Sequence, residues 1–529
     1  MKGTVLITDN LDPVCAEILT GSGYQVDTHV GKSHEELLEL ARTADAWIVR
    51  SGTKITADLI EAADRLQVIG RAGVGVDNID LEAATRRGVL VINAPDGNTI
   101  STAEHTCAML MSAVRRIPQA VASLKGGEWN KKAFKGAEVN GKTLGIIGVG
   151  KIGQAVAQRM KSFGVKVLGY DPVLSREVAD RIGVTLVSLE ELLEQSDVIT
   201  VHTPLSDSTR GLLNRDTLAR CRDGVYIVNC ARGGIVDEKD LLEAIESGKV
   251  AGAALDVYSA EPPPEGLGDL VRHPKVVATP HIAASTGEAQ EKVAVQVTEQ
   301  VAKALGGEPV TVAVNAMAIK GAGRPELRPY VRLADMLGRF AAQLCDGQVD
   351  RVTVKLFGDL PSQNGDVLSV AALKGLFGTL VSGPVNLVNA PFLAEEMGLQ
   401  VDEQLLTSGD GYANLVGVVL RSGSQVVRVG GTVFSENDLR LVRIDDFRLE
   451  VRPGGYMLVY HNVDRPGVLA SVGTILAEAN INIAAMALGR DTETSRALTV
   501  IDLDDEVPAS VLEKIGGLKD VTEPRLIRA

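Results

Sequence analysis

The strongest constraint on the fold of this chain is a glycine pattern placed between an apolar strand and a helix. A strand is predicted over Thr143–Ile147 and a helix over Lys151–Phe163. Between them lies the pattern Gly148-x-Gly150-x-x-Gly153. The first glycine permits a tight turn, the second lets the backbone approach a pyrophosphate, and the third lets the helix pack closely on the strand. The pattern predicts a dinucleotide-binding unit with phosphates at the positive helix end.

The next strand indicates which dinucleotide binds. It is predicted over Lys166–Tyr170 and is followed by Asp171. A carboxylate at this place accepts hydrogen bonds from the adenosine ribose and repels a 2′-phosphate, so NAD is favoured over NADP. We include Lys151 and Ile152, inside the glycine turn, among the expected cofactor contacts. The alternative is a glycine-rich turn beside a surface aspartate.

The length of the chain requires several domains. A chain of 529 residues is too long for one core and predicts three or four. Aromatic residues make up 3%, so the cores must be aliphatic, which suits buried parallel strands. Alternating strands and helices predict an α/β fold. We expect a discontinuous substrate domain (1–97 and 286–316), an NAD-binding domain (98–285), an intervening domain (317–453) and a regulatory domain (454–529), with a linker at 452–455.

Charge and cysteine content exclude several classes of function. The formal net charge of −14 argues against nucleic-acid and anionic-membrane partners. The five cysteines are scattered, which predicts neither a disulfide framework nor a metal site and favours a reducing compartment. No apolar run is long enough for a signal segment or a membrane span, so we expect a cytoplasmic protein.

Histidines at strand ends are the candidates for proton transfer. His202 and Thr203 follow a strand of the nucleotide domain and are expected to line the cofactor pocket. His281 follows another strand, at the carboxyl edge where doubly wound sheets bind ligands. His105 lies on an apolar helix, where a core histidine is expected.

Two charged residues follow neighbouring strands. Hydride transfer between a 2-hydroxy acid and NAD needs a base, a group that orients the base, and a cation for the carboxylate. Glu261 is the candidate acid and Arg232 the candidate cation. Their strand ends can meet at one crevice with His281. The alternative is a structural ion pair beside an isolated loop histidine.

These residues lie in segments that resemble the D-isomer-specific 2-hydroxyacid dehydrogenases. The segments are Asn229–Asp237, Ala254–Val257, Glu261-Pro262 and Pro280–Ala283. The resemblance implies that Arg232 binds the substrate carboxylate and keto oxygen. It also implies that His281 is the proton donor and acceptor, and that Glu261 orients it and favours its charged form. The implied fold is a Rossmann-type domain inserted in a flavodoxin-like substrate domain.

The same resemblance implies further cofactor contacts. Asp256 would contact the nicotinamide amide, and Thr99, with Glu104 nearby, lies at the hinge into the cofactor domain. The residues implied to line the cofactor are Cys230, Ala231, Arg232, Ala283 and Ala284. A nucleophilic role for Cys230 is disfavoured because hydride transfer needs no covalent intermediate.

Basic residues in the first domain point to a phosphorylated substrate. Arg50 and Arg71 follow strands, and fixed guanidinium groups suit a dianionic phosphate. The loops resemble those of family members that oxidise 3-phosphoglycerate in the first step of L-serine biosynthesis, which adds Gly73 and Val74 as contacts. The alternative is solvated loop charge. Trp129, with Lys131 and Lys132, is a weaker candidate for a contact with a neighbouring subunit's site.

The last two units are not needed for the chemistry. Residues 317–453 resemble the intervening domain of long bacterial members, where Arg440, Arg443 and Arg452 form a candidate anion site or ordinary surface charge. The C-terminal strand and helix order is βαββαβ and resembles an ACT domain. Its candidate effector residues are Asn462, Asp464 and Gly467, and the resemblance implies L-serine with Asn482 completing the site. The alternative is a module that only pairs subunits.

The resemblance implies a homo-oligomer, a dimer through the nucleotide domain and then a tetramer. Two other functions stay open from the sequence. A glyoxylate or hydroxypyruvate reductase would use the same three residues but would lack the two C-terminal units. An NAD-sensing scaffold would not need the complete set Arg232, Glu261 and His281.

Overall fold

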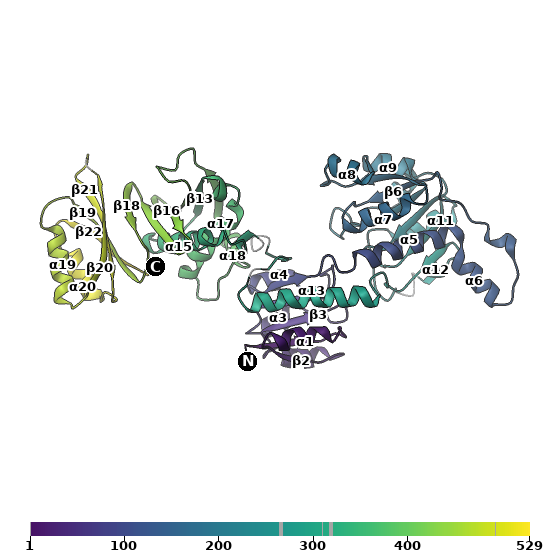
Figure 1. The fold of residues 1–529 in the computed structure, drawn as a ribbon, viewed down its shortest axis with the longest axis horizontal. Coiled ribbons are helices and arrows are strands. Elements are labelled where there is room, and N and C mark those ends of the chain that lie inside the picture. Colours follow the sequence, from purple (N-terminus) through teal and green to yellow (C-terminus); the bar gives the residue numbers. More distant parts are fainter. Residues whose placement is uncertain (1, 264–267, 309, 317–320, 492, 529) are drawn as a thin grey trace.

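The chain is built around four β-sheets, of which the N-terminal one lies between the nucleotide-binding unit and the C-terminal half (Figure 1). The computed structural model describes residues 2–263, 268–308, 310–316, 321–491 and 493–528. The domain limit expected at 316/317 falls at the edge of residues 317–320, which lie outside the described residues. Within these ranges no helix has the length and apolar character needed to cross a membrane. No cluster of residues suited to a metal ion occurs among them.

The N-terminal unit has a five-stranded parallel sheet of order β2-β1-β3-β4-β5, the flavodoxin-like order. Its strands are β1 (Thr4–Ile7), β2 (Gln25–Thr28), β3 (Ala46–Val49), β4 (Val68–Arg71) and β5 (Leu90–Asn93). Its helices are α1 (Val14–Gly21), α2 (His34–Ala41), α3 (Ala57–Ala62) and α4 (Leu81–Arg86). Helix α13 (Gly287–Leu305) returns from the nucleotide unit and packs on α1 and β4 (Figure 1). A Cβ at Gly70 would lie 2.6 Å from Val301, so this close packing requires glycine.

The nucleotide unit is entered through α5 (Thr99–Arg115). Its parallel sheet has the order β12-β11-β10-β9-β6-β7-β8. The strands are β6 (Thr143–Ile147), β7 (Lys166–Tyr170), β8 (Thr185–Leu186), β9 (Val198–Val201), β10 (Val225–Asn229), β11 (Val250–Leu255) and β12 (Val276–Ala278). The order reverses between β6 and β9, the switch point at which doubly wound sheets bind ligands.

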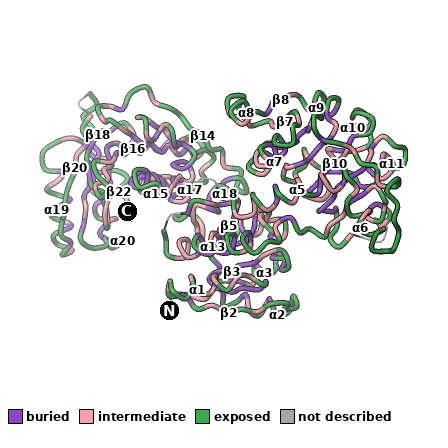
Figure 2. The backbone as a smooth tube through the Cα atoms, turned by 45° about the vertical axis from the view of Figure 1, so that its right-hand side comes forward, coloured by how far each residue is buried: buried purple, intermediate pink, exposed green. Residues whose placement is uncertain are grey.

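The remaining helices of this unit differ in burial. They are α6 (Ile117–Lys125), η1 (Lys131–Phe134), α7 (Lys151–Lys161), α8 (Arg176–Ile182), α9 (Leu189–Gln195), α10 (Arg215–Arg220), α11 (Glu238–Glu246) and α12 (Gly268–Arg272). The strands are mostly buried, whereas α6 has no buried residue and stands out as exposed in Figure 2.

The C-terminal half holds two further sheets. The six-stranded sheet contains β14 (Gln400–Leu405), β13 (Arg351–Phe357), β15 (Leu415–Ser422), β16 (Gln425–Ser435), β17 (Asp438–Ile444) and β18 (Phe447–Val451), in that order. Its helices are α15 (Arg328–Leu344), α16 (Asp359–Ser362), α17 (Gly365–Leu380) and α18 (Ala390–Glu396). The last sheet contains β20 (Ile483–Asp491), β21 (Arg496–Leu503), β19 (Tyr456–Val463) and β22 (Val521–Arg528), all antiparallel. With α19 (Val468–Glu478) and α20 (Ala509–Gly516) it forms the expected βαββαβ unit.

Residues 452–455 separate two sheets but not two cores. Side chains on one face of the last sheet, including Met457, Val459 and Leu498, belong to the same buried cluster as Leu333 and Phe340 of α15. This contact removes apolar surface of both C-terminal units from water, so each unit stabilises the other. Residues 452–455 therefore join two units whose buried side chains form one continuous cluster.

Candidate functional site

The glycine turn after β6 has the geometry that its sequence predicts. Gly148 has φ +89°, and a Cβ there would lie 2.8 Å from the carbonyl of His202. A Cβ at Gly153 would lie 2.3 Å from the oxygen of Gly148. A Cβ at Gly150 would meet no described atom within 4 Å. Packing thus requires glycine at positions 148 and 153. Gly150 instead leaves open space at the beginning of α7, where Lys151 and Ile152 lie.

Asp171 contacts the glycine turn directly. Its Oδ2 accepts a hydrogen bond of 2.8 Å from the N–H of Val149, and its Oδ1 accepts one of 2.9 Å from Val173. The carboxylate therefore lies beside the open space above Gly150. The buried hydroxyls of Thr99 and Thr203 have no hydrogen-bond partner among the described residues. Open space, a carboxylate and unsatisfied hydroxyls at the switch point fit a bound dinucleotide.

Two expected cofactor residues are neutral. Burial lowers the pKa of His202 to about 4, so its imidazole is uncharged near neutral pH. Burial, with the nearby charge of Asp256, raises the pKa of the Cys230 thiol to about 12. A protonated thiol is a poor nucleophile, which agrees with a packing role for Cys230.

The candidate base and its acidic partner are in contact. Nδ1 of His281 lies 2.7 Å from Oε2 of Glu261, and both side chains are partly exposed. Oε1 of Glu261 accepts a 3.1 Å hydrogen bond from the N–H of Tyr258. His281 has φ +53°, a left-handed conformation that is uncommon outside glycine and often marks a functional position. The pairing leaves Nε2 of His281 as the ring nitrogen available to a ligand.

The loop that carries Arg232 touches the loop that carries Glu261. Asn229 shapes the first loop, because its side chain bonds the N–H of Ala231 at 3.0 Å and the carbonyl of Arg232 at 2.9 Å. A Cβ at Gly233 would lie 1.7 Å from the carbonyl oxygen of Tyr258, so the two backbones are in close contact. Backbone packing and hydrogen bonds thus connect the Arg232 loop through Tyr258 and Glu261 to His281.

The guanidinium of Arg232 reaches the N-terminal unit. Its Nε lies 3.1 Å from Oδ2 of Asp77. A Cβ at Gly75 would lie 2.0 Å from Nη2 of Arg232, so the guanidinium lies against the backbone of the loop after β4. Arg232 therefore spans the two units, and glycine at position 75 makes room for it.

Two more arginines, Arg71 and Arg50, lie near Arg232. A Cβ at Gly73 would lie 1.7 Å from Nη1 of Arg71, so Arg71 also lies on this loop. Burial, reinforced by the positive charges of Arg232 and Arg50, lowers the pKa of Arg71 to about 10. The Nε of Arg71 is buried without a described partner. Val74 holds the loop through its carbonyl, which accepts a 2.5 Å bond from Asn93. Arg71 and Arg232 lie on the loop after β4, and the charge of Arg50 acts on Arg71, so positive charge is concentrated here in a form that suits an anion.

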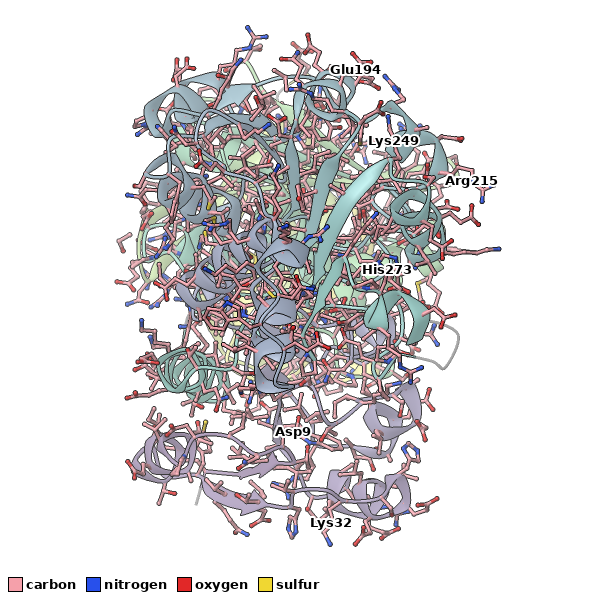
Figure 3. All side chains as sticks on the ribbon, turned by 90° about the vertical axis from the view of Figure 1, so that its right-hand side faces the viewer. Asp9, Lys32, Glu194, Arg215, Lys249 and His273 are labelled. Atoms are coloured by element: carbon pink, nitrogen blue, oxygen red, sulfur yellow. The ribbon has the colours of Figure 1, made fainter. Side chains whose placement is uncertain are left out.

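Two carboxylates that support the site were not predicted from the sequence. Asp9 accepts hydrogen bonds from the N–H of Arg50 and from the N–H and hydroxyl of Thr53. In Figure 3 it lies at the margin of the N-terminal unit nearest the nucleotide unit, whereas Lys32 lies at the far margin. Glu238 accepts from the N–H and hydroxyl of Ser259, in the Glu261 loop. The position of Asp9 after the end of β1 is the sequence feature from which its role at the site could have been predicted.

The remaining cofactor candidates lie around the same unit. Lys151 contacts Asp96, and Glu104 contacts Arg159 at 3.4 Å. Asp256 is completely buried, and its carboxylate accepts hydrogen bonds from the N–H groups of Ile282 and Ala283. Its contact with a nicotinamide stays a prediction, as does that of Ala284.

The structure does not bring the four effector candidates together within one chain. Asn462 and Asp464 lie at the end of β19, next to Gly467 at the beginning of α19. Asn482 immediately precedes β20. The first residue of β20, Ile483, and the first residue of β19, Tyr456, both pair with Leu503 of β21. Asn482 therefore lies at the other end of the sheet. Within one chain Asn482 is thus separated from the other three effector candidates, because β19 and β20 both run antiparallel to β21.

The other basic candidates have acidic or aromatic partners. Arg440 and Arg452 both pair with Asp438, and Arg443 pairs with Asp410. Each of these guanidinium groups therefore has an acidic partner, although Asp438 is shared by two of them. Trp129 is 77% exposed, and the ammonium of Lys131 lies 5.7 Å from its ring centroid.

Three family models match the chain. The NAD binding domain of D-isomer specific 2-hydroxyacid dehydrogenases matches residues 107–283. The intervening domain of D-3-phosphoglycerate dehydrogenase matches residues 326–445, and the ACT domain matches residues 456–520. These matches place an NAD-binding unit, an intervening unit and an ACT unit in this order.

Relatives match the chain over its full length. A D-3-phosphoglycerate dehydrogenase of Methanocaldococcus jannaschii is 42% identical over 99% of both chains. One of Bacillus subtilis is also 42% identical over 99% of both. Among solved structures, a D-lactate dehydrogenase of Aquifex aeolicus in complex with NAD and lactic acid is 30% identical. It covers 57% of this chain and 96% of its own, with a TM-score of 0.53.

Proposed function

This chain belongs to the D-isomer-specific 2-hydroxyacid dehydrogenases, and we propose that it oxidises 3-phospho-D-glycerate to 3-phosphohydroxypyruvate with NAD, the first step of L-serine biosynthesis. Relatives that carry the name D-3-phosphoglycerate dehydrogenase match it from end to end. A glyoxylate reductase of known structure covers 59% of it. The two C-terminal units therefore favour the phosphorylated substrate.

The observation that carries the proposal is the cluster of Arg50, Arg71 and Arg232 around the loop after β4. The substrate has two anionic ends, a carboxylate and a phosphate. Arg232 comes from the nucleotide unit, next to the loop of the acid–imidazole pair, and is assigned the carboxylate and the keto oxygen. Arg71 and Arg50 come from the N-terminal unit and are assigned the phosphate, with Gly73 and Val74 supplying backbone contacts. Bidentate guanidinium groups suit both anions.

Proton transfer is assigned to His281. Because Nδ1 faces Glu261, Nε2 accepts the proton of the C2 hydroxyl as the carbonyl forms. The carboxylate of Glu261 stabilises the charge that develops on the ring, and Arg232 stabilises the developing keto oxygen. In the reverse direction the same Nε2 returns the proton.

The cofactor is held by residues of the turn after β6. When bound, NAD would supply the acceptor for the hydride that leaves C2. Gly150, Lys151 and Ile152 offer backbone to its pyrophosphate, and Asp171 offers a carboxylate to the ribose. Thr99 and Thr203 contribute hydroxyls that lack partners among the described residues. The residues proposed to surround the nicotinamide end are Cys230, Ala231, Asp256, Ala283 and Ala284.

Initial-rate assays test the proposal. NADH production with 3-phosphoglycerate is compared with that from glycerate, and the reverse reaction is run with 3-phosphohydroxypyruvate, hydroxypyruvate and glyoxylate. We expect kcat/KM to be at least about 100-fold higher for the phosphorylated compounds, because two lost guanidinium contacts are worth several kcal/mol. Equal or better use of the unphosphorylated acids would replace the proposal by a hydroxypyruvate or glyoxylate reductase. Specific NAD binding without turnover of any of these acids would support a non-enzymatic NAD sensor.

We further propose that L-serine binds the ACT unit and inhibits the enzyme. Asn462, Asp464 and Gly467 surround the turn between β19 and α19, and a second copy supplies Asn482, which immediately precedes the half of β20 that is exposed in one chain. Serine titration of wild type and of Asn462→Ala tests this. Loss of inhibition in the variant is expected, and inhibition that survives unchanged would remove the site.

Subunit pairing is proposed through α6. Ile117, Val121 and Leu124 of this helix are exposed apolar side chains, each 45% exposed or more, a pattern typical of an interaction surface. We propose a dimer through this face and a tetramer through the ACT unit. Light scattering of wild type and of Leu124→Glu tests the first contact, and an unchanged mass would contradict it.

Localisation and domain limits complete the proposal. We place the protein in the cytoplasm, since the cysteines of the described residues are free, as in a reducing compartment.

We also propose four domains, with the limits 1–97 with 286–316, 98–285, 317–453 and 454–529. Limited proteolysis, with cleavage sites determined by mass spectrometry, tests these limits.

A further inference from the structure

His105 of α5 lies against the strand ends that carry the candidate catalytic base. Its Nε2 is 3.3 Å from Oδ1 of Asp256 and 3.3 Å from Oγ1 of Thr279. The His105 side chain is 18% exposed, and that of Asp256 is completely buried. Among the described residues, His105 is the basic side chain that pairs with this carboxylate. A buried carboxylate needs such partners, because burial without them costs several kcal/mol.

Asp256 holds both sides of the His281 turn. The Thr279 hydroxyl donates to Oδ1 at 2.5 Å, two residues before His281. The N–H of Ile282 donates to Oδ1, and that of Ala283 to Oδ2, each at 2.9 Å, immediately after it. His281 lies between these contacts with φ +53°. A left-handed conformation at histidine persists where surrounding contacts determine it, and here one carboxylate supplies three of them.

His105 brings this network to the helix that joins the two units. Helix α5 begins at Thr99, directly after the N-terminal sheet, and packs along β10, β11 and β12. Met109 of the same helix also contacts the Thr279 hydroxyl. The orientation of the turn is therefore tied to α5 at two successive helical positions, 105 and 109.

We propose that His105 is a positioning residue for the dehydrogenase reaction: its hydrogen bonds to Asp256 and Thr279 set the direction in which His281 points. The inference rests on the proposed function, because it needs His281 to be the base. It assigns no contact with substrate to His105. Its effect on the reaction passes through the turn 279–283.

The test compares His105→Ala with His105→Gln, whose side-chain amide can place a donor near the position of Nε2. We expect kcat with 3-phosphoglycerate to fall about 10- to 100-fold in the alanine variant, since small displacements of a reacting group have effects of this size. The glutamine variant should recover most of the loss. NAD affinity, measured by protein fluorescence, should stay within about threefold, because the adenosine half of the site is remote from this network. His34→Ala, at an exposed histidine of α2, is the matched control and should retain wild-type kcat.

A second variant keeps the test valid if His105→Ala folds poorly. Thr279→Val removes the hydroxyl with little change of volume, and the double variant with His105→Gln should show non-additive effects on kcat. A kcat within twofold of wild type in His105→Ala would overturn the proposal. A second result would also overturn the proposal: the alanine and glutamine variants lose equal amounts of kcat and of melting temperature, and the effect of Thr279→Val on kcat adds to that of His105→Gln. That result would indicate that His105 acts by packing alone. Absence of turnover in the wild type would instead overturn the proposed function.

Discussion

The carboxylate of Glu261 and the imidazole of His281 form a 2.7 Å hydrogen bond although they follow different strands, β11 and β12. Oε1 of Glu261 is held by the N–H of Tyr258, and His281 is held by the contacts of Asp256 on both of its sides. The pair is therefore positioned from both ends before any ligand binds. This preorganisation makes several consequences of substitution predictable.

Removal of the imidazole should stop turnover and leave cofactor binding intact. In His281→Ala we expect kcat to fall at least about 100-fold, the usual contribution of a positioned general base. NAD affinity should change little, because the ring is proposed to act on the substrate and not to bind the cofactor. Steady-state rates and a fluorescence titration with NAD measure the two effects. Weak NAD binding with normal turnover would contradict the assignment of His281.

A methyl group at position 233 should separate the two catalytic loops. The Cβ of Gly233→Ala would lie 1.7 Å from the Tyr258 carbonyl, so one of the backbones must move. We expect destabilisation of about 1 to 3 kcal/mol and a loss of kcat of about 10-fold or more. Gly473→Ala, in α19 where a Cβ meets no described atom within 4 Å, is the matched control and should retain wild-type kcat. Wild-type activity in Gly233→Ala would show that the contact does not support the site.

Neutralising Asp171 should relax the choice of cofactor. Asp171→Asn keeps a group that can accept from Val149 but removes the negative charge opposite a 2′-phosphate. We expect the ratio of kcat/KM for NAD to that for NADP to fall about 10-fold or more. A selectivity unchanged from wild type would mean that another group rejects the phosphate.

Burial of His202 should make stability depend on pH. Its folded-state pKa of about 4 lies below the ordinary value of 6.5, so between these values the unfolded chain binds more protons. Stability should therefore fall as the pH decreases from about 6.5 to about 4, by up to about 3 kcal/mol. His202→Gln should reduce this part of the loss. Urea midpoints at pH 7 and pH 4.5 measure the difference, and identical pH dependence in variant and wild type would contradict it.

The shared core of the C-terminal half should decide which truncations fold. Removing residues 453–529 takes Met457, Val459 and Leu498 out of the buried cluster that they share with α15, and removes β22, which packs on α15. We expect that truncation to aggregate or to melt at a lower temperature. Removing residues 321–529 takes away both partners and should retain NAD-dependent turnover. Size-exclusion chromatography and activity assays distinguish the two, and a soluble, fully stable 1–452 chain would contradict the shared core.

Much of the candidate site could be predicted because its parts are local. Gly148, Gly150 and Gly153 act within one strand–turn–helix unit, and their roles follow from neighbouring residues. The candidates Arg232, Glu261 and His281 directly follow strands of one parallel sheet, whose carboxyl ends share an edge. Asp9 follows the same rule in the first sheet and was overlooked because an isolated aspartate after a strand has no distinguishing pattern.

The amino-acid sequence by itself determined the elements, the two parallel sheets and the residues available at their edges, since hydrophobic periodicity and turn chemistry act over short stretches of chain. Tertiary structure alone decided which of these residues touch. Arg232 lies on Gly75 and His105 reaches Asp256 because segments distant in sequence pack with particular faces. Met457 joins α15 in one core, and Asn482 lies far from Asn462, for the same reason: contacts between elements depend on their relative placement, which no local pattern encodes.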